Sequence, residues 1–130
     1  MRIVFVDQDN TCRSQLAEAL VSLDAAEGVE AYSAGFEAGD ELDANTRQVM
    51  EELGYDMSAH FTKSLDDLPD LEFDYVVSLG VGDPMLKARM SLEWDVPDPR
   101  IRDVRSMRDM RDTLRERITR LLAAPRTIMY

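Results

Sequence analysis

Hydrophobic residues form two kinds of pattern that follow each other along the chain. One is a short continuous run, and the other is a longer stretch with helical spacing. Continuous runs such as RIVFV and FDYVVSLG are typical of strands that are buried in a parallel sheet. They predict strands at residues 2–6, 29–35, 73–80 and, from the weaker run SLEW, 91–94. Apolar residues three and four positions apart predict helices at 14–26, 43–53 and 103–122. A short helical turn is expected at 64–68, with Ser64 as its cap.

The order of these elements is β-α-β-α-turn-β-β-α, which predicts an α/β fold. We expect a three-layer sandwich in which helices cover both faces of a four-stranded parallel sheet. The 130 residues are the size of a single domain, 1–130, without internal repeats, linkers or low-complexity segments. Ligands of such sheets bind beyond the carboxyl ends of the strands, near a change of strand order. The loop after the first strand is therefore the first candidate for a binding site.

The chain carries 26 acidic and 15 basic residues, and its net charge of −11 is unevenly distributed. Residues 1–99 have a net charge of −16 and residues 100–130 a net charge of +5. Because the acidic part would repel phosphate backbones, a nucleic-acid partner is not expected. Of the basic residues 13 are Arg and 2 are Lys. An acid excess with little Lys is typical of halophile-like proteins kept soluble at high salt, and an ordinary acidic cytosolic protein fits equally well.

The sequence contains no apolar run of about 18 residues, and its first residues lead directly into a strand. We therefore expect neither a membrane span nor a signal peptide, and a cytoplasmic location. Cys12 is the single cysteine, so no disulfide can form within the chain. This fits a reducing compartment.

Eight polar or charged residues, DQDNTCRS at positions 7–14, connect the first strand to the first helix. A loop that enters a helix presents free backbone N–H groups and the positive end of the helix dipole, which suit a tetrahedral anion. Arg13 adds a forked donor, and Asn10 is a residue type that tolerates a left-handed turn. The same spacing fits an ordinary strand-to-helix loop with a Ser-capped helix, and the two interpretations have about equal weight.

The segment VFVDQDNTCRSQLAEAL resembles the start of the low-molecular-weight protein tyrosine phosphatases and the related arsenate reductases. These begin with a strand, a Cys-x5-Arg-Ser/Thr loop and a helix. The resemblance continues through YSAG (32–35), GYDMSAHFTKSL (54–65), FDYVVSLG (73–80) and WDVPDP (94–99), nearly the whole chain. It implies the same α/β fold, hydrolysis of phosphomonoesters such as phosphotyrosine, and no cofactor.

The resemblance also implies roles for individual residues. Backbone N–H groups of 8–13 would surround the phosphate, and Arg13 would bind it with two hydrogen bonds. Asp98 would be the general acid, and Cys12 matches a second cysteine that can protect the nucleophile by forming a disulfide. Ser14 would donate a hydrogen bond towards the nucleophile at position 7. The phosphate-binding residues implied in this way are Gln8, Asp9, Asn10, Thr11, Cys12, Arg13 and Ser14.

Position 7 holds Asp where the family pattern has the nucleophilic cysteine. A carboxylate is a weaker nucleophile than a thiolate, and its oxygens can occupy the anion site and pair with Arg13. Asp9 adds a second negative charge, and two carboxylates about 4 Å apart repel each other by roughly 1 to 4 kcal/mol. We therefore expect an impaired or inactive phosphatase, a pseudoenzyme. The alternative is a regulatory protein that binds phosphate or phosphopeptides without hydrolysing them.

Two further enzyme readings follow from the same loop. DQDNT also resembles the Asp-x-Asp-x-Thr motif of the haloacid dehalogenase phosphatases, and Ser33, Lys63 and Asp83 follow in a similar order. In that reading Asp7 and Asp9 would bind Mg²⁺, which would neutralise them. The longer match NTCRSQLAEAL favours the tyrosine phosphatase fold. An arsenate reductase with a disulfide relay is less favoured, because residues 78–90 contain no thiol.

The remaining candidates have simpler interpretations. His60, the only histidine, is expected to be a structural residue with satisfied hydrogen bonds. Arginines recur along residues 102–120 among acidic residues, which predicts local ion pairs on a solvated helix face. The alternative is that this basic face docks on the acidic part of a second copy, so a monomer or a homodimer is expected.

Overall fold

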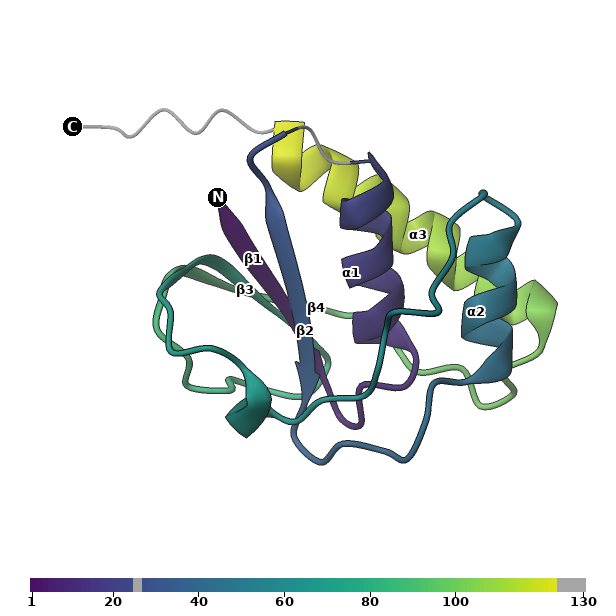
Figure 1. The fold of residues 1–130 in the computed structure, drawn as a ribbon, viewed down its shortest axis with the longest axis horizontal. Helices are drawn as coiled ribbons and strands as arrows, with labels where there is room; N and C mark the ends of the chain where they lie inside the picture. Colours follow the sequence, from purple (N-terminus) through teal and green to yellow (C-terminus); the bar gives the residue numbers. More distant parts are fainter. Residues whose placement is uncertain (25–26, 124–130) are drawn as a thin grey trace.

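The computed structural model describes residues 1–24 and 27–123 and contains one sheet of four parallel strands (Figure 1). The strands are β1 (Arg2–Asp7), β2 (Glu30–Gly35), β3 (Phe73–Leu79) and β4 (Ala88–Trp94). The helices are α1 (Arg13–Asp24), α2 (Ala44–Glu51) and α3 (Val104–Ala123), with a short 3-10 helix, η1, at Leu65–Asp67. The predicted α/β class and the four-stranded parallel sheet are confirmed.

The strand order β2-β1-β3-β4 places β1 in the interior of the sheet. Val6 of β1 lies opposite Ala34 on β2 and opposite Ser78 on β3. The chain runs from β1 to its neighbour on one side and then crosses to its neighbour on the other. The loop after β1 therefore opens at the change of strand order, where ligands of such sheets bind. This end of the sheet is at the bottom of Figure 1.

The two faces of the sheet have different covers. Ile3 and Phe5 of β1 pack in the larger core together with residues of all three helices. Val4 and Val6 point the other way, into a smaller core that Leu65 of η1 and loop residues complete. The α-helices therefore cover one face only, contrary to the expectation of helices on both, and η1 with the loops around it forms the layer on the other face (Figure 1).

Element ends agree with the sequence patterns to within two residues, except at the start of β4, which begins at Ala88 and not at 91. The added residues include Arg89 and Met90, whose side chains are exposed at the sheet edge, so they lack the alternation of a half-buried strand. The predicted end of the first helix, at 25–26, lies outside the described residues. None of the described helices is long and apolar enough to cross a membrane.

Candidate functional site

Residues 7–14 connect β1 to α1 and pack tightly against the end of β2. Asp7 lies opposite Gly35 in the β1–β2 register. A Cβ atom on Gly35 would lie 2.8 Å from the backbone nitrogen of Asn10 and 2.8 Å from the carbonyl carbon of Asp9. These contacts are with backbone and cannot be relieved by moving a side chain. Glycine at position 35 therefore permits the close approach of the loop to β2.

Asn10 fixes the conformation of the loop. Its φ of 59° is in the left-handed region, as its residue type suggested. Its Nδ2 donates to Ser14 Oγ at 2.7 Å, and its Oδ1 accepts from Gln15 Nε2 at 2.7 Å and from the Lys63 backbone N–H at 2.9 Å. The buried amide thus joins the loop to α1 and to the segment before η1.

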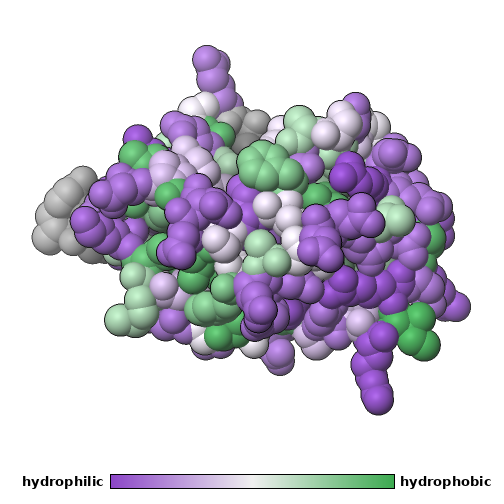
Figure 2. Space-filling model, turned by 60° about the horizontal axis from the view of Figure 1, so that its bottom comes forward, coloured by the Kyte–Doolittle hydropathy of each residue, from purple (hydrophilic) through white to green (hydrophobic). Residues whose placement is uncertain are grey.

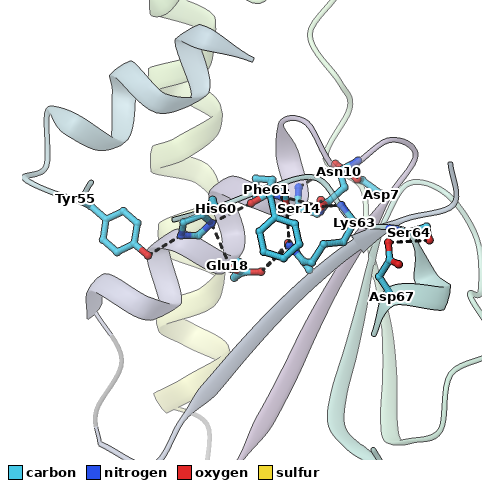
Figure 3. Close-up of polar contacts among 12 residues, drawn as sticks. Asp7, Asn10, Ser14, Glu18, Tyr55, His60, Phe61, Lys63, Ser64 and Asp67 are labelled. Atoms are coloured by element: carbon cyan, nitrogen blue, oxygen red, sulfur yellow. Dashed lines mark hydrogen bonds and ion pairs between the residues drawn. The ribbon is translucent and has the colours of Figure 1, made fainter. Parts of the chain in front are cut away.

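A chain of hydrogen bonds continues from Asn10 towards the protein surface (Figure 3). Gln15 Oε1 lies 3.0 Å from His60 Nδ1, and His60 Nε2 lies 2.7 Å from the Tyr55 hydroxyl. Burial lowers the pKa of His60, so the imidazole is neutral at neutral pH. With Nδ1 as the donor to Gln15, Nε2 accepts from Tyr55. The prediction of a structural histidine with satisfied hydrogen bonds is confirmed.

Glu18 of α1 completes the polar cluster behind the loop. Its carboxylate lies 3.3 Å from His60 Nδ1 and 3.7 Å from Lys63 Nζ, and it accepts from Ser33 Oγ at 2.7 Å. Lys63 Nζ also donates to the carbonyl of Phe61 at 3.0 Å. Ser33 and Lys63, two residues of the haloacid dehalogenase reading, therefore bind Glu18.

Asp7 is almost fully buried at the base of the loop, and both of its carboxylate oxygens accept backbone hydrogen bonds. Oδ1 accepts from the Asn10 N–H at 2.8 Å and Oδ2 from the Ser14 N–H at 3.0 Å. Burial raises the pKa of the Asp7 carboxyl above its ordinary value of 3.8, while the Ser14 and Asn10 hydrogen bonds and the Arg13 guanidinium oppose the rise. The carboxylate therefore uses two of the N–H groups that open into the loop.

Asp9 makes a separate set of contacts. Its Oδ1 accepts from the Thr11 hydroxyl at 2.8 Å and from the Thr11 N–H at 3.2 Å, in a turn closed within the loop. Among the described residues, no group of three or more His, Cys, Asp or Glu side chains could hold a metal ion. Asp7 and Asp9 thus lack a third protein ligand of these types, and the magnesium reading stays a prediction.

Arg13 is buried at the start of α1, and the ends of two other strands hold its guanidinium. Nη1 donates to the carbonyl of Leu79 at 2.7 Å and to that of Val96 at 2.9 Å. Nε is buried as well, yet no described residue accepts a hydrogen bond from it. A buried guanidinium N–H without a partner is costly, and a bound anion would satisfy it.

The loop backbone presents more donors of the same kind. Within residues 1–24 and 27–123, no acceptor binds the N–H groups of Gln8, Asp9, Cys12 or Arg13. They lie in the loop that leads into the N-terminus of α1, where the helix dipole favours negative charge. The predicted phosphate-binding residues 8–14 therefore follow directly after Asp7, the residue at the position of the nucleophile.

Cys12 points away from this cluster into the core between α1 and α3. Its Sγ lies 3.6 Å from the sulfur of Met107, and burial raises the pKa of the thiol from 9.0 to about 12. The neutral, buried thiol is a poor nucleophile. Because Cys12 is the only cysteine, the protective disulfide that the resemblance implied has no second thiol in this chain.

Asp98 reaches the loop through another residue. Arg102 forks onto its carboxylate, with Nη2 at 2.6 Å and Nε at 3.1 Å, and the same guanidinium donates to Thr11 Oγ1 at 3.1 Å. The Asp98 hydrogen bond raises the pKa of Arg102. The structure thus places Asp98 at the mouth of the loop as an ion-paired carboxylate. The general-acid role implied for it stays a prediction.

Most of the chain also matches a known protein family. Residues 2–127 match the family described as low molecular weight phosphotyrosine protein phosphatase. The chain belongs to this family. Among the curated relatives of this phosphatase-family protein is the glutaredoxin arsenate reductase of Synechocystis sp., 28% identical over 94% of this chain and 96% of the relative. Arsenate reductase 1 of Staphylococcus epidermidis is 29% identical over 89% of this chain and 91% of the relative.

Solved structures that are similar to this chain include both arsenate reductases and phosphatases. An arsenate reductase in the phosphate-binding state superposes with a TM-score of 0.84 at 28% identity, covering 94% of this chain and 96% of that one. The YwlE arginine phosphatase from Geobacillus stearothermophilus gives a TM-score of 0.78 at 28% identity, covering 93% and 90%. The similarity supports the fold and the family, and it does not choose between the two activities.

Some residues of the site were not identified from the sequence. Gln15 donates a hydrogen bond to Asn10, Gly35 packs against the backbone of residues 8–10, and Arg102 donates to the Thr11 hydroxyl. Arg102 stands four residues after Asp98, a spacing typical of ion pairs, and that signal was available. The contact of Gly35 with residues 8–10 depends on strand register, which no short motif reveals.

Proposed function

We propose that this member of the family binds a tetrahedral oxyanion, namely phosphate, arsenate or the phosphoryl group of a monoester, at residues 7–14. We further propose that it turns the ligand over far more slowly than a thiolate enzyme would. The observation that carries the proposal is the buried Nε of Arg13, which has no acceptor among the described residues. Open backbone N–H groups in the same loop offer the remaining hydrogen bonds.

Slow turnover follows from the side chain at position 7. Attack on phosphorus needs an activated nucleophile, and the Asp7 carboxylate already accepts hydrogen bonds at both oxygens. Each of those bonds opposes the rise in the pKa of Asp7 that burial causes, and orients the carboxylate oxygens towards the backbone. By resemblance the family pattern has a cysteine here, so the proposal describes a binding loop that lacks its thiol chemistry.

The curated relatives are named for arsenate reduction, which gives arsenate a place among the proposed ligands. Reduction by a relay between thiols of one chain needs at least two cysteines. This sequence has only Cys12, which is buried against Met107. We therefore propose that the chain shares oxyanion binding with these relatives and does not share an internal thiol relay.

Titration calorimetry with phosphate and with arsenate tests the proposal. The wild-type protein should bind both anions, and Arg13→Lys should bind them at least about tenfold more weakly, because an ammonium cannot replace the guanidinium fork. Arg105→Lys, an exposed change on α3, is the matched control and should keep wild-type affinity. Circular dichroism should show that both variants are folded. Absence of binding by the wild type, or equal affinity in Arg13→Lys, would contradict the proposal.

A further inference from the structure

The base of the candidate site contains many hydrogen-bond donors and one carboxylate. The donors are the Arg13 guanidinium and the open backbone N–H groups of the loop. The acceptor is the Asp7 carboxylate, whose two oxygens each accept one backbone N–H. The Ser14 side chain also hydrogen-bonds to the carboxylate. A carboxylate offers about four acceptor positions, so about one is left for a ligand in the loop.

A fully deprotonated anion and a protonated one would interact with Asp7 in opposite ways. Sulfate at neutral pH has only acceptor oxygens, so one of them would face the Asp7 carboxylate with like charge and no hydrogen bond. Hydrogen phosphate has an O–H group that can donate to a carboxylate oxygen, while its other oxygens accept from Arg13 and the backbone. A buried acceptor that faces another acceptor is costly, and a hydrogen bond between charged partners is among the strongest.

We propose that Asp7 makes the loop selective for oxyanions that carry a proton, such as hydrogen phosphate and hydrogen arsenate, and makes it reject sulfate. The inference rests on the proposed oxyanion binding and adds its specificity. It gives the unusual residue of the loop a positive role as the acceptor that recognises the ligand's O–H. A phosphomonoester would bind as its singly protonated form, which becomes abundant as the pH falls towards about 6.

The surroundings of Asp7 support this assignment. Arg13 and Ser14 face it from α1, Asn10 faces it from the loop, and β2 contributes the uncharged Gly35. The neighbouring carboxylate of Asp9 is bound to Thr11. Beyond Thr11, at the mouth of the loop, Asp98 and Arg102 are paired with each other.

Protonation of Asp7 itself would remove the selectivity. A protonated carboxyl can donate to a sulfate oxygen, so sulfate binding should appear as the pH falls and should take up a proton. Inorganic phosphate carries an O–H group at every pH in the working range and does not need that step. A purely electrostatic site would also bind sulfate relatively better at low pH, because phosphate loses charge there, so the distinguishing sign is the proton that the protein takes up when sulfate binds.

The test is titration calorimetry of the full chain with phosphate and with sulfate, at matched ionic strength, at pH 7.5 and pH 5.5. Wild-type protein should prefer phosphate by at least about tenfold at pH 7.5, which corresponds to about 1.4 kcal/mol, and by less at pH 5.5. Asp7→Asn should bring the two affinities within about threefold, because an amide can both donate and accept. Asp70→Asn, an exposed change between η1 and β3, should keep the wild-type preference.

The possible outcomes separate the inference from the proposed function. Phosphate and sulfate binding with equal affinity by the wild type would overturn the selectivity and leave oxyanion binding intact. A preference that persists in Asp7→Asn would show that another residue causes it and would also overturn the inference. Absence of phosphate binding by the wild type would overturn both proposals. The wild-type affinity ratio at pH 7.5 and the proton uptake on sulfate binding decide the matter even if Asp7→Asn does not fold.

Discussion

The loop at residues 7–14 has a supported side and an open side, and the two treat their polar groups differently. On the supported side Asn10, Gln15 and His60 form hydrogen bonds with one another in an unbroken chain. On the open side Arg13 Nε and four backbone N–H groups lack acceptors among the described residues. Buried polar groups are normally satisfied, so several donors without acceptors in one loop support a ligand site there.

The arginines of α3 provide a second contrast with Arg13. Arg108 and Arg111 bind Glu52, next to α2, and Arg115 binds Asp24 of α1, with N···O distances of 2.6 to 2.9 Å. These pairs attach α3 to other elements, whereas the sequence pattern had suggested mainly pairs within the helix. The outer face of α3 is mostly hydrophilic and charged, and whether the protein is a monomer or a homodimer stays a prediction.

Figure 2 shows a mainly hydrophilic surface with scattered apolar residues on the lower side of the molecule.

Gly35→Ala should have the largest effect on oxyanion binding, because Gly35 supports the backbone of the whole loop. The new Cβ would lie 2.8 to 2.9 Å from backbone atoms of residues 8–10 and would displace the donors. We expect oxyanion affinity to fall by about a hundredfold, as for a displacement of about 1 Å in a positioned site. Calorimetry with phosphate measures this effect.

Gly28→Ala is the matched control for that experiment. Gly28 has a φ of 92°, and no atom of residues 1–24 or 27–123 lies within 4 Å of an added Cβ, so the change strains the backbone without touching the loop. It should lower the free energy of unfolding by about 1 kcal/mol and leave the affinity unchanged. Equal loss of affinity in both glycine variants would argue against a specific role for Gly35.

Removing His60 tests the far end of the supported side. His60→Ala leaves Gln15 Oε1 and the Tyr55 hydroxyl without their partner, which should cost about 1 to 3 kcal/mol of stability and weaken phosphate binding by several-fold. His60→Asn keeps a donor near the place of Nδ1 and should restore most of the affinity. Urea unfolding and calorimetry measure the two effects. Equal affinity in the alanine variant and the wild type would show that the chain ends before the loop.

The lowered pKa of His60 adds a pH dependence with a definite sign. The unfolded chain takes up a proton near the ordinary value of 6.5, and the native protein does so only at lower pH. The contribution of His60 to stability is therefore present above pH 6.5 and decreases as the pH falls below it. The difference in unfolding free energy between wild type and His60→Asn should shrink from pH 7.5 to pH 5.5. A constant difference would contradict the assignment of a neutral imidazole.

A smaller and opposite effect is expected for Asp7. Because burial raises its pKa above 3.8, the native protein binds this proton more readily than the unfolded chain does. As the pH falls from neutral towards 3.8, wild type should gain stability relative to Asp7→Asn, and below that value the gain should level off. Urea unfolding of both proteins across this range cancels the contributions of the other carboxylates. A relative loss on acidification would mean that the hydrogen bonds to Asp7 outweigh its burial.

The sequence predicted the parts of the fold that repeat a simple pattern. The strand at 73–80 is a continuous apolar run and the helix at 103–122 has clear helical spacing, and both predictions agree with the structure to within one residue at each end. The start of β4 was missed because an exposed edge strand carries no such periodicity. The unequal cover of the two sheet faces depends on how the loops pack, which local patterns do not encode.

The candidate site also has features that the sequence predicted and features that it did not. The spacing and residue types of 7–14 fitted an anion loop and an ordinary strand-to-helix loop equally well, and the family resemblance favoured the anion loop with position 7 at its base. The structure places these residues between β1 and the first turn of α1. The hydrogen bonds of Asp7 to Asn10 and Ser14, and the coupling of Asp98 to Arg102, depend on three-dimensional contacts. The direction of the Cys12 side chain could not be predicted either, because its place in the motif gives no sign that it faces Met107 in the core.

Hydrolysis of p-nitrophenyl phosphate by the wild type and by Asp7→Cys, each with EDTA and with Mg²⁺, tests the central claim most directly. The account predicts that Asp7→Cys turns over at the same rate with either addition, while the wild type shows almost no turnover in either. That result would mean that the loop is an intact oxyanion site and that Asp7 alone removes the thiol chemistry. Turnover by the wild type that needs Mg²⁺ and stops with EDTA would contradict the account and make Asp7 a working carboxylate.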